Sequence, residues 1–576
     1  MKKNRRPEQA GAFPPSEPLS LRAARVLAAP LSGLLLIPAF APYNITVLAW
    51  AALLPLLWSL SGATIRGAAL RGYLFGVAYL ASLFWWLVVV RYPAPLGYAF
   101  FAIVLPVIFI PWAVLANRLM RLKSAVYRIW LPAALWTLFE FSMSHGALAL
   151  PWWSLANTQA KNLVTAQIAA VGGVYSISFL IVLINFVLFA ALTAFISGRN
   201  KKIIPAGKNA KYTKQREDKI PGPQSPFQND FISDMTTYAA AAALLAASII
   251  YGCVSLSQPI KITRPRPVRL ALIQGSFDQN EKDANVEMGV LLKKHLEMTD
   301  AAVAKEHPDI IVWSETITPL SWLNDTPNRE SWLTRLKYYN ASLVTGVYNW
   351  DKRDRSFNSV VAFDPDKGLL GEYRKIQVVP FGEKFPFRAQ IEKISPWAGR
   401  WIKREVYEYD TYPGKEYTVF DSKFGKFGAV ICFESVFPQI VRPIVRRGAE
   451  FLFIITNDAW FYDTPGTYQH AAIASLRAIE SRRFVVQAAN SGISAIIDPY
   501  GRVVAETKIF VQDTLFGDIY PETEITLYTR FGDVIVWLCL AFAIPALAAF
   551  ATGARKTPES NAPAPEPPIK KKAAKR

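Results

Sequence analysis

Cysteine and histidine are scarce in this sequence of 576 residues, which holds three cysteines and four histidines. Cys253 and Cys539 fall inside apolar runs, so Cys432 is the only thiol in the large polar region of the chain. A single thiol can build neither a disulfide framework nor a cysteine zinc site. Four histidines in so long a chain also argue against a multi-histidine metal site.

Charged residues are also few, at 19% of the chain, whereas hydrophobic residues make up 52%. Soluble domains usually carry about a quarter of charged residues. The formal net charge of +20 would be compatible with nucleic acid as a partner. However, the lysines and arginines form short blocks beside apolar runs and in the tails, a pattern typical of membrane topology. We therefore expect a lipid bilayer, and no nucleic acid, as the partner of this chain.

Long apolar runs fill the first 257 residues and return near the carboxyl terminus. A membrane-spanning helix needs roughly 20 mostly apolar residues, and such helices tolerate proline. The sequence predicts a membrane α-helical bundle of about eight spans. The predicted spans are 26–41, 45–61, 68–90, 97–117, 125–144, 164–197, 234–257 and 531–553.

The distribution of lysine and arginine predicts the orientation of these spans. With the amino terminus inside, the inner segments hold 27 basic residues and the short outer loops hold two, Arg91 and Lys161. Because basic residues concentrate on the cytoplasmic side, both termini are predicted to be cytoplasmic. The predicted units are a cytoplasmic tail (1–25), a seven-span membrane domain (26–257) with a basic cytoplasmic linker (198–231), an outer domain (258–530), a last span (531–553) and a disordered basic tail (554–576).

The outer stretch 258–530 alternates strand patterns with helical ones. VRLALIQGS (268–276) and FGAVICFES (427–435) are typical of buried strands, and helical spacing follows near 284–306 and 438–447. Further strand and helix patterns alternate up to SAIIDPYGRVVAE. Such alternation favours a layered α/β domain.

Cys432 stands where a nucleophile is expected. It ends the apolar strand GAVIC, just before a helix that Pro438 helps to begin. A helix amino terminus favours negative charge, so we expect it to favour the thiolate over the thiol. No histidine lies near Cys432 in sequence, although the fold could bring His470 close.

Two charged residues are candidates for a base and for a stabiliser of an oxyanion. Glu315 closes the strand IIVWSE beside Trp313, where a carboxylate with a raised pKa would serve as a base. Lys375 follows a strand pattern and precedes a loop with a second acid, Glu383. Each of these residues alone is more often a surface charge than a catalytic group.

Together these motifs resemble the nitrilase superfamily. They are VWSET with Glu315, YRK and PFGEKFP with Lys375, and ICFES with Cys432; TNDAWF and RAIESRRFVVQAANSG follow. Seven predicted spans precede this domain and one follows it. This arrangement looks like the bacterial apolipoprotein N-acyltransferase family, and the resemblance covers nearly the whole chain.

This resemblance implies a four-layer α-β-β-α sandwich for the outer domain. Cys432 would be the nucleophile, Glu315 the general base and Lys375 the cation that stabilises the tetrahedral oxyanion. It implies no metal and no organic cofactor. The residues that match further positions in or near the family active site are Glu383, Phe433, Glu434 and Trp460.

The resemblance also implies the substrates and the compartment. A phospholipid would donate its acyl chain to Cys432 as a thioester, and the α-amino group of a diacylglyceryl-cysteine prolipoprotein would accept it. The enzyme would be a monomer in the bacterial inner membrane with a periplasmic catalytic domain. The membrane part would bring both lipid substrates to the site and so provide proximity.

Two positions depart from the family pattern. Phe433 stands where the family often has tyrosine, which removes any role for a phenol hydroxyl there. Asp283 stands where many members carry tryptophan, which removes a stacking contact.

Two features of the membrane part invite a role. Glu140 lies near the outer end of the fifth predicted span, either as a functional group at membrane depth or as a residue at headgroup level. The aromatic segment LPWWSLANTQ (150–159) would either line a lipid entrance or form an interfacial tryptophan belt.

Two other functions compete with acyl transfer. A membrane-anchored amidase or nitrilase acting on small C–N substrates would use the same residues, with water as acceptor, but it needs only one anchor. A transporter with a non-catalytic sensor domain would show paired polar or broken helices at mid-membrane. It would leave the Glu–Lys–Cys set unexplained.

Overall fold

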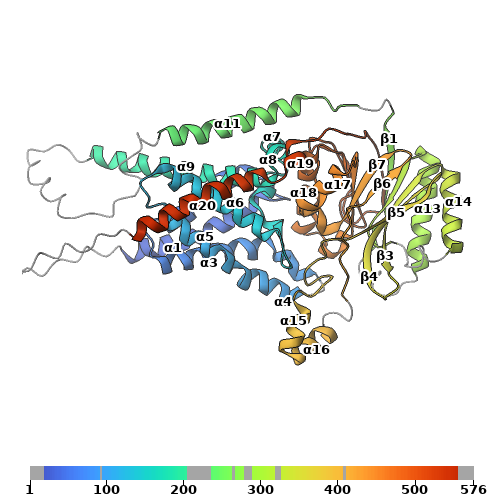
Figure 1. The fold of residues 1–576 in the computed structure, drawn as a ribbon, viewed down its shortest axis with the longest axis horizontal. Coiled ribbons are helices and arrows are strands. Elements are labelled where there is room, and N and C mark those ends of the chain that lie inside the picture. The colour runs from blue at the N-terminus through green and yellow to red at the C-terminus, as the bar shows by residue number, and fades with distance from the viewer. Residues whose placement is uncertain are drawn as a thin grey trace, which may run out of the picture.

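The computed structural model describes residues 18–90, 94–203, 235–262, 266–277, 288–317, 326–405 and 410–555. An elongated helical body (residues 18–257 and 534–555) occupies one end of the molecule, and a two-sheet domain (residues 266–531) occupies the other (Figure 1). The helices α1 and α20, which contain the two described ends of the chain, both reach the end of the helical body that is remote from the sheets.

Apolar helices joined by short 3-10 or π turns build the helical body. Four of its helical segments are long and apolar enough to cross a membrane: Leu19–Ala39, Gly97–Leu119, Val174–Ile196 and Met235–Ser257. The predicted count of eight spans therefore stays a prediction. The elements are α1 (Leu19–Leu36), η1 (Ile37–Ala39), η2 (Thr46–Trp50), α2 (Leu54–Leu60), α3 (Ile65–Leu83), η3 (Trp85–Val89), α4 (Ala94–Ala99), η4 (Phe100–Val104), η5 (Leu105–Ile108), α5 (Phe109–Leu119), η6 (Val126–Trp130), α6 (Leu131–Met143), η7 (Pro151–Trp153), η8 (Leu155–Gln159), α7 (Leu163–Ala166), α8 (Ala169–Gly172), α9 (Val174–Ile203), α11 (Met235–Ser257) and α20 (Val534–Arg555).

Not every predicted span is a single uninterrupted α-helix. The span 45–61 divides into η2 and α2. The span 164–197 divides into α7, α8 and α9, and Gly173 separates α8 from α9 at a φ of 72°. This φ is incompatible with a right-handed helix. A Cβ at Gly173 would also approach the Tyr528 ring to 2.7 Å, so both the conformation and the packing require glycine there.

Two six-stranded sheets form the core of the two-sheet domain. Their strand orders are β12-β1-β2-β3-β4-β5 and β11-β10-β9-β8-β7-β6. In the first sheet, β1 pairs along its whole length with β12, from Val268 opposite Ile519 to Gln274 opposite Asp513. The strands are β1 (Val268–Gln274), β2 (Ile310–Trp313), β3 (Ser342–Trp350), β4 (Ser356–Asp364), β5 (Gly368–Arg374), β6 (Val419–Ser422), β7 (Gly425–Ile431), β8 (Phe451–Thr456), β9 (Val485–Ala489), β10 (Ala495–Ile497), β11 (Val503–Glu506) and β12 (Asp513–Ile519).

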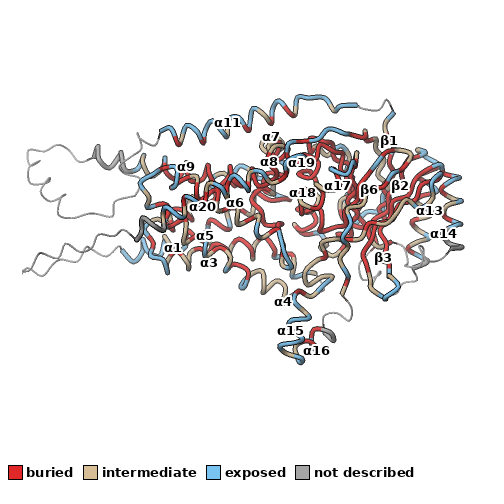
Figure 2. The backbone as a smooth tube through the Cα atoms, viewed as in Figure 1, coloured by how far each residue is buried: buried red, intermediate tan, exposed pale blue. Residues whose placement is uncertain are grey.

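Helices cover the outer faces of both sheets, so the domain is the expected α-β-β-α sandwich. Because successive strand residues point to opposite faces, Leu270 and Leu272 pack with the core of the second sheet. Ala271 and Ile273 pack outward with the helices α13 and α14. Figure 2 shows the buried backbone concentrated in these layers and where they meet the helical body. The helices and turns are α13 (Met288–Glu306), α14 (Thr326–Tyr339), α15 (Arg388–Ile394), α16 (Pro396–Glu405), η10 (Cys432–Val436), α17 (Pro438–Arg446), η11 (Asp458–Phe461), α18 (Pro465–Ser481) and α19 (Leu527–Phe531).

Buried hydrogen bonds join the α17–α18 layer to the helical body. The Trp152 indole N–H donates to Gln469 Oε1 at 2.8 Å, and the Val174 N–H donates to Glu480 Oε1 at 3.0 Å. Trp152 is 2% exposed, and the neighbouring Trp153 is 1% exposed. The alternative of an interfacial belt is therefore wrong, whereas the lipid entrance stays a prediction. Both tryptophans lie inside the molecule, and Trp152 contacts the two-sheet domain.

The side chain of Glu140 is buried inside the protein. Its carboxylate accepts hydrogen bonds from the Trp136 indole at 2.7 Å, the Ser154 hydroxyl at 2.6 Å and the Leu155 N–H at 2.9 Å. It thus fixes the 150–159 segment against α6, and this segment carries Trp152.

Candidate active site

Cys432 begins the turn η10 immediately after the buried strand β7. Its φ is 49°, in the left-handed region that non-glycine residues rarely adopt. Such a conformation costs on the order of 1–3 kcal/mol and persists only where the surroundings enforce it. The chain turns sharply there, and the Thr456 side chain at the end of β8 hydrogen-bonds the buried thiol. The strand end therefore holds the thiol in one place.

Lys375 follows β5, and its backbone N–H donates to Asn358 O at 2.8 Å. Its ammonium lies 2.8 Å from Glu383 Oε1 and 3.6 Å from Glu315 Oε1, and the side chain is 1% exposed. Burial opposes its charge, but the carboxylates of Glu383 and Glu315 outweigh burial and raise the pKa of Lys375. The lysine is therefore a fixed positive charge at neutral pH.

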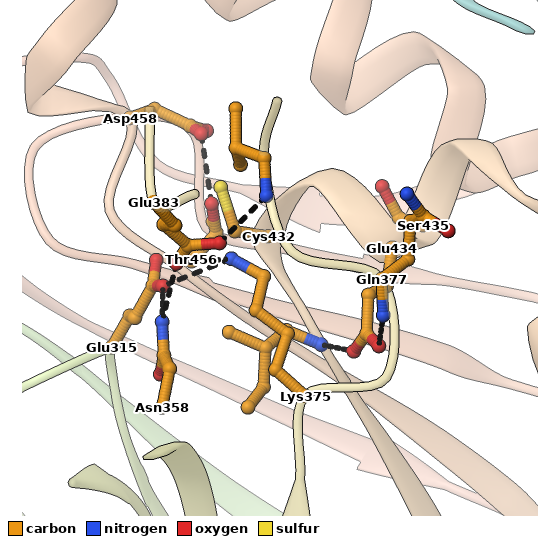
Figure 3. Close-up of polar contacts among 12 residues, drawn as sticks. Glu315, Asn358, Lys375, Gln377, Glu383, Cys432, Glu434, Ser435, Thr456 and Asp458 are labelled. Atoms are coloured by element: carbon orange, nitrogen blue, oxygen red, sulfur yellow. Dashed lines mark hydrogen bonds and ion pairs between the residues drawn. The ribbon is translucent and has the colours of Figure 1, made fainter. Parts of the chain in front are cut away.

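Asn358 joins the two carboxylates. Its side-chain amide donates to Glu315 Oε1 at 2.7 Å and to Glu383 Oε1 at 2.9 Å. The Val379 N–H donates to the second oxygen of Glu383 at 2.8 Å. Figure 3 shows Glu315, Glu383 and the Lys375 ammonium converging on the Cys432 thiol. The structure thus brings together four of the residues that the sequence singled out, namely Glu315, Lys375, Glu383 and Cys432, and it adds Asn358.

The surroundings of Cys432 disfavour its thiolate form. Burial, and next the charge of Glu315, raise the pKa of Cys432, although the Lys375 ammonium acts in the opposite direction. The expectation that a helix amino terminus favours the thiolate is wrong, because η10 separates Cys432 from the first turn of α17. The thiol must therefore lose its proton to a neighbouring base during the reaction, and the Glu315 carboxylate is placed close enough to influence it.

Glu434 links two backbone segments of the site through hydrogen bonds. One of its oxygens accepts the N–H groups of Ile376 and Gln377 at 2.6 and 3.0 Å, and the other accepts the Ile431 N–H at 2.8 Å. The Tyr373 hydroxyl donates to the same carboxylate at 2.8 Å. Glu434 therefore ties the residues after Lys375 to the residue before Cys432, and it does not face the thiol (Figure 3).

Two of the remaining predicted residues, Phe433 and Trp460, lie in the turns η10 and η11. The Phe433 ring packs edge-on against Phe437 at 5.0 Å and parallel to Trp152 at 6.4 Å. Trp460 is partly buried in η11. Asp283 lies outside the described residues. Within the described ranges, no group of three or more histidine, cysteine, aspartate or glutamate residues is arranged to hold a metal ion.

The fold and the site define a carbon-nitrogen hydrolase domain, since residues 269–527 match the family model of that name. Residues 32–187 match the model described as the apolipoprotein N-acyltransferase N-terminal domain. The chain belongs to the apolipoprotein N-acyltransferase family.

Relatives of this chain from several bacteria carry that name. The one from Geobacter metallireducens is 30% identical over 527 residues, which cover 90% of this chain and 93% of the relative. The one from Chlorobaculum tepidum is 29% identical, with 89% and 94% covered. Among solved structures, Saccharomyces cerevisiae Nit3, a nitrilase-superfamily member, covers 48% of this chain and 95% of its own at 19% identity, with a TM-score of 0.33.

Proposed function

We propose that this protein moves a fatty acyl chain from a phospholipid, through a thioester on Cys432, to the α-amino group of the amino-terminal diacylglyceryl-cysteine of a lipoprotein. The observation that carries the proposal is the convergence of Lys375, Glu315 and Glu383 on the buried thiol. Family membership over 90% of the chain and the packing of the domain onto apolar helices support it.

In the first half-reaction Glu315 takes the thiol proton and the Cys432 sulfur attacks the ester carbonyl of the phospholipid. The carbonyl oxygen becomes negative, and the Lys375 ammonium stabilises it, which is a large contribution in a buried site. The ester C–O bond then breaks. Glu315 returns the proton to the leaving oxygen, so a lysophospholipid departs and the acyl group stays on sulfur.

In the second half-reaction the amine of the lipoprotein attacks the thioester carbonyl. Glu315 accepts a proton from the attacking nitrogen, the C–S bond breaks and the proton returns to sulfur. Lys375 stabilises the same oxygen again. Glu383 and Asn358 do not exchange protons in this scheme: they hold Lys375 and Glu315 in place through contacts of 2.8 and 2.7 Å.

The acyl-enzyme gives a direct test. Purified enzyme supplied with phospholipid and no lipoprotein is expected to release one equivalent of lysophospholipid in a burst and to carry the acyl mass on the Cys432 peptide in mass spectrometry. A diacylglyceryl-cysteine peptide added afterwards is expected to remove that mass and to become N-acylated. Continuous release of free fatty acid, with no N-acylated peptide, would instead identify the membrane-anchored hydrolase.

We further propose that the two-sheet domain faces the periplasm and that both termini are cytoplasmic, in the inner membrane. The excess of lysine and arginine in the predicted inner segments supports this orientation. A phosphatase reporter that is active only outside the cytoplasm, fused after residue 300, is expected to be active. The same reporter fused after residue 215 is expected to be silent, and the opposite pair of results would reverse the orientation.

A further inference from the structure

His470 contacts the turn η10 (Cys432–Val436), which begins with the nucleophile and is called the nucleophile turn below. It belongs to the buried helix α18, and its side chain is fully buried. Its Nε2 lies 3.0 Å from the carbonyl oxygen of Cys432 and 2.8 Å from the Ser435 hydroxyl. Its Nδ1 lies 2.8 Å from Asp458 Oδ1, and Asp458 also accepts the Thr456 hydroxyl at 2.8 Å. Both ring nitrogens therefore have partners, and the Nε2 partners belong to η10.

A residue of the helical body fixes the plane of the imidazole. The Trp152 indole lies parallel to it, with a centroid distance of 5.6 Å and an interplanar angle of 19°. Trp152 is itself held by its hydrogen bond to Gln469, the neighbour of His470. Phe461 meets the ring edge-on at 6.5 Å. The orientation of His470 thus depends on contacts from both parts of the molecule.

A buried histidine needs a hydrogen-bond partner for each ring nitrogen, and any polar group can be that partner. Here the Nε2 partners are the carbonyl of Cys432 and the hydroxyl of Ser435 in the same short turn. The backbone of Cys432 has a φ of 49° and needs outside support to stay there. The Nδ1 partner, Asp458, is one of the groups whose negative charge disfavours the thiolate of Cys432.

We propose that His470 is a positioning residue for Cys432. It holds the nucleophile turn in its left-handed conformation through a hydrogen bond to the Cys432 carbonyl. The positive charge of its imidazolium form also offsets the negative charge of Asp458 beside the thiol. The proposal rests on the proposed function, in which Cys432 is the nucleophile. Only the imidazolium form donates from both nitrogens at once, so only this form serves both roles together.

The charged neighbours of the imidazole favour that form. Burial opposes the positive charge, but the carboxylate of Asp458, and more weakly that of Glu315, outweigh burial and raise the pKa of His470 above its ordinary value. Ser435, Trp152 and Phe461, which also lie against the ring, carry no charge. The imidazolium therefore persists to a higher pH than in an exposed histidine.

The experiment compares variants in a Cys253→Ala/Cys539→Ala background, so that Cys432 is the only thiol. Two quantities are measured: the pH profile of Cys432 alkylation by iodoacetamide, and the rate of the lysophospholipid burst. In His470→Leu, the uncompensated charge of Asp458 is expected to move the alkylation profile about one unit to higher pH. The lost hydrogen bond to the turn is expected to slow the burst on the order of 10-fold or more.

A double variant separates the two roles. His470→Leu/Asp458→Asn removes both charges, so the alkylation profile is expected to return towards that of the parent while the burst stays slow. His470→Gln keeps one donor for the turn and is expected to give an intermediate burst rate. It replaces His470→Leu if thermal unfolding in detergent shows that the leucine variant does not fold.

Parental alkylation profiles and burst rates in folded His470→Leu and His470→Gln proteins would overturn the proposal. A defect in the burst that the double variant fully repairs would overturn the role in holding the turn. Failure of the proposed function itself has a different signature: the parent protein, with His470 intact, would then show no burst and no acyl mass on Cys432.

Discussion

A Cys432→Ala variant is expected to release no lysophospholipid and to form no N-acylated peptide. The substitution removes the atom that would carry the acyl chain, and no neighbouring group replaces it: Thr456 hydrogen-bonds the thiol, while Glu315 and Lys375 are charged. Loss of a covalent nucleophile commonly lowers turnover by several orders of magnitude, about 10⁶-fold where it has been dissected. The measurement is mass spectrometry of the enzyme after incubation with labelled phospholipid.

The variant is expected to fold like the parent. Alanine and cysteine both carry a Cβ, so the backbone constraint at a φ of 49° is the same for both. The matched controls are Cys253→Ala in α11 and Cys539→Ala in α20, which lie in the helical body and are expected to keep full activity. Near-normal turnover in the Cys432→Ala protein would remove Cys432 from the mechanism.

A Lys375→Met variant is expected to lose at least 10²-fold in the rate of acyl-enzyme formation, the size of effect that follows loss of one oxyanion stabiliser. Methionine keeps most of the aliphatic length but brings no charge. The variant also leaves Glu315 and Glu383 facing each other without the ammonium that lies 3.6 and 2.8 Å from them. The breaking of such a buried ion pair costs about 3–5 kcal/mol of stability, so folding must be measured beside activity.

Two comparisons separate these effects. Lys384→Met removes an exposed charge from the same loop and is expected to change neither property. A Lys375→Met/Glu383→Gln variant removes one of the two facing carboxylates, so it is expected to recover stability without recovering the burst. Recovery of the burst in that double variant would mean that Lys375 only balances charge and does not stabilise the oxyanion.

The sequence predicted the elements whose apolar runs are long and clearly bounded. The strand predicted at 268–276 is β1 (Val268–Gln274), and the helix predicted near 438–447 is α17 (Pro438–Arg446). It did not predict β12 or the helices α15 and α16. β12 is only half-buried along most of its length, and it has no apolar run of its own. α15 and α16 project from the body, so no core-facing pattern marks them (Figure 1).

The sequence predicted only those residues of the candidate site that lie in recognisable local motifs. Glu315, Lys375 and Cys432 each end a strand or follow one, which places them at the edge of a sheet where side chains meet. Asn358 was missed, although a polar residue inside the apolar strand SFNSVVAFD was a signal for it. The contact between Trp152 and His470 could not be predicted, because it joins parts of the chain that are 318 residues apart only after folding.

The pairing of β1 with β12 has a consequence for how the protein is made. β1 is the first strand of the two-sheet domain to leave the ribosome and β12 is the last, yet they are neighbours in the sheet. Until residue 519 has been synthesised, one edge of β1 stays unpaired, and open strand edges invite aggregation. Only a short segment separates β12 from the apolar helix α20. Closure of the sheet must therefore wait until nearly the whole chain has been made, and nascent chains that stall before β12 should be the ones that quality-control proteases remove.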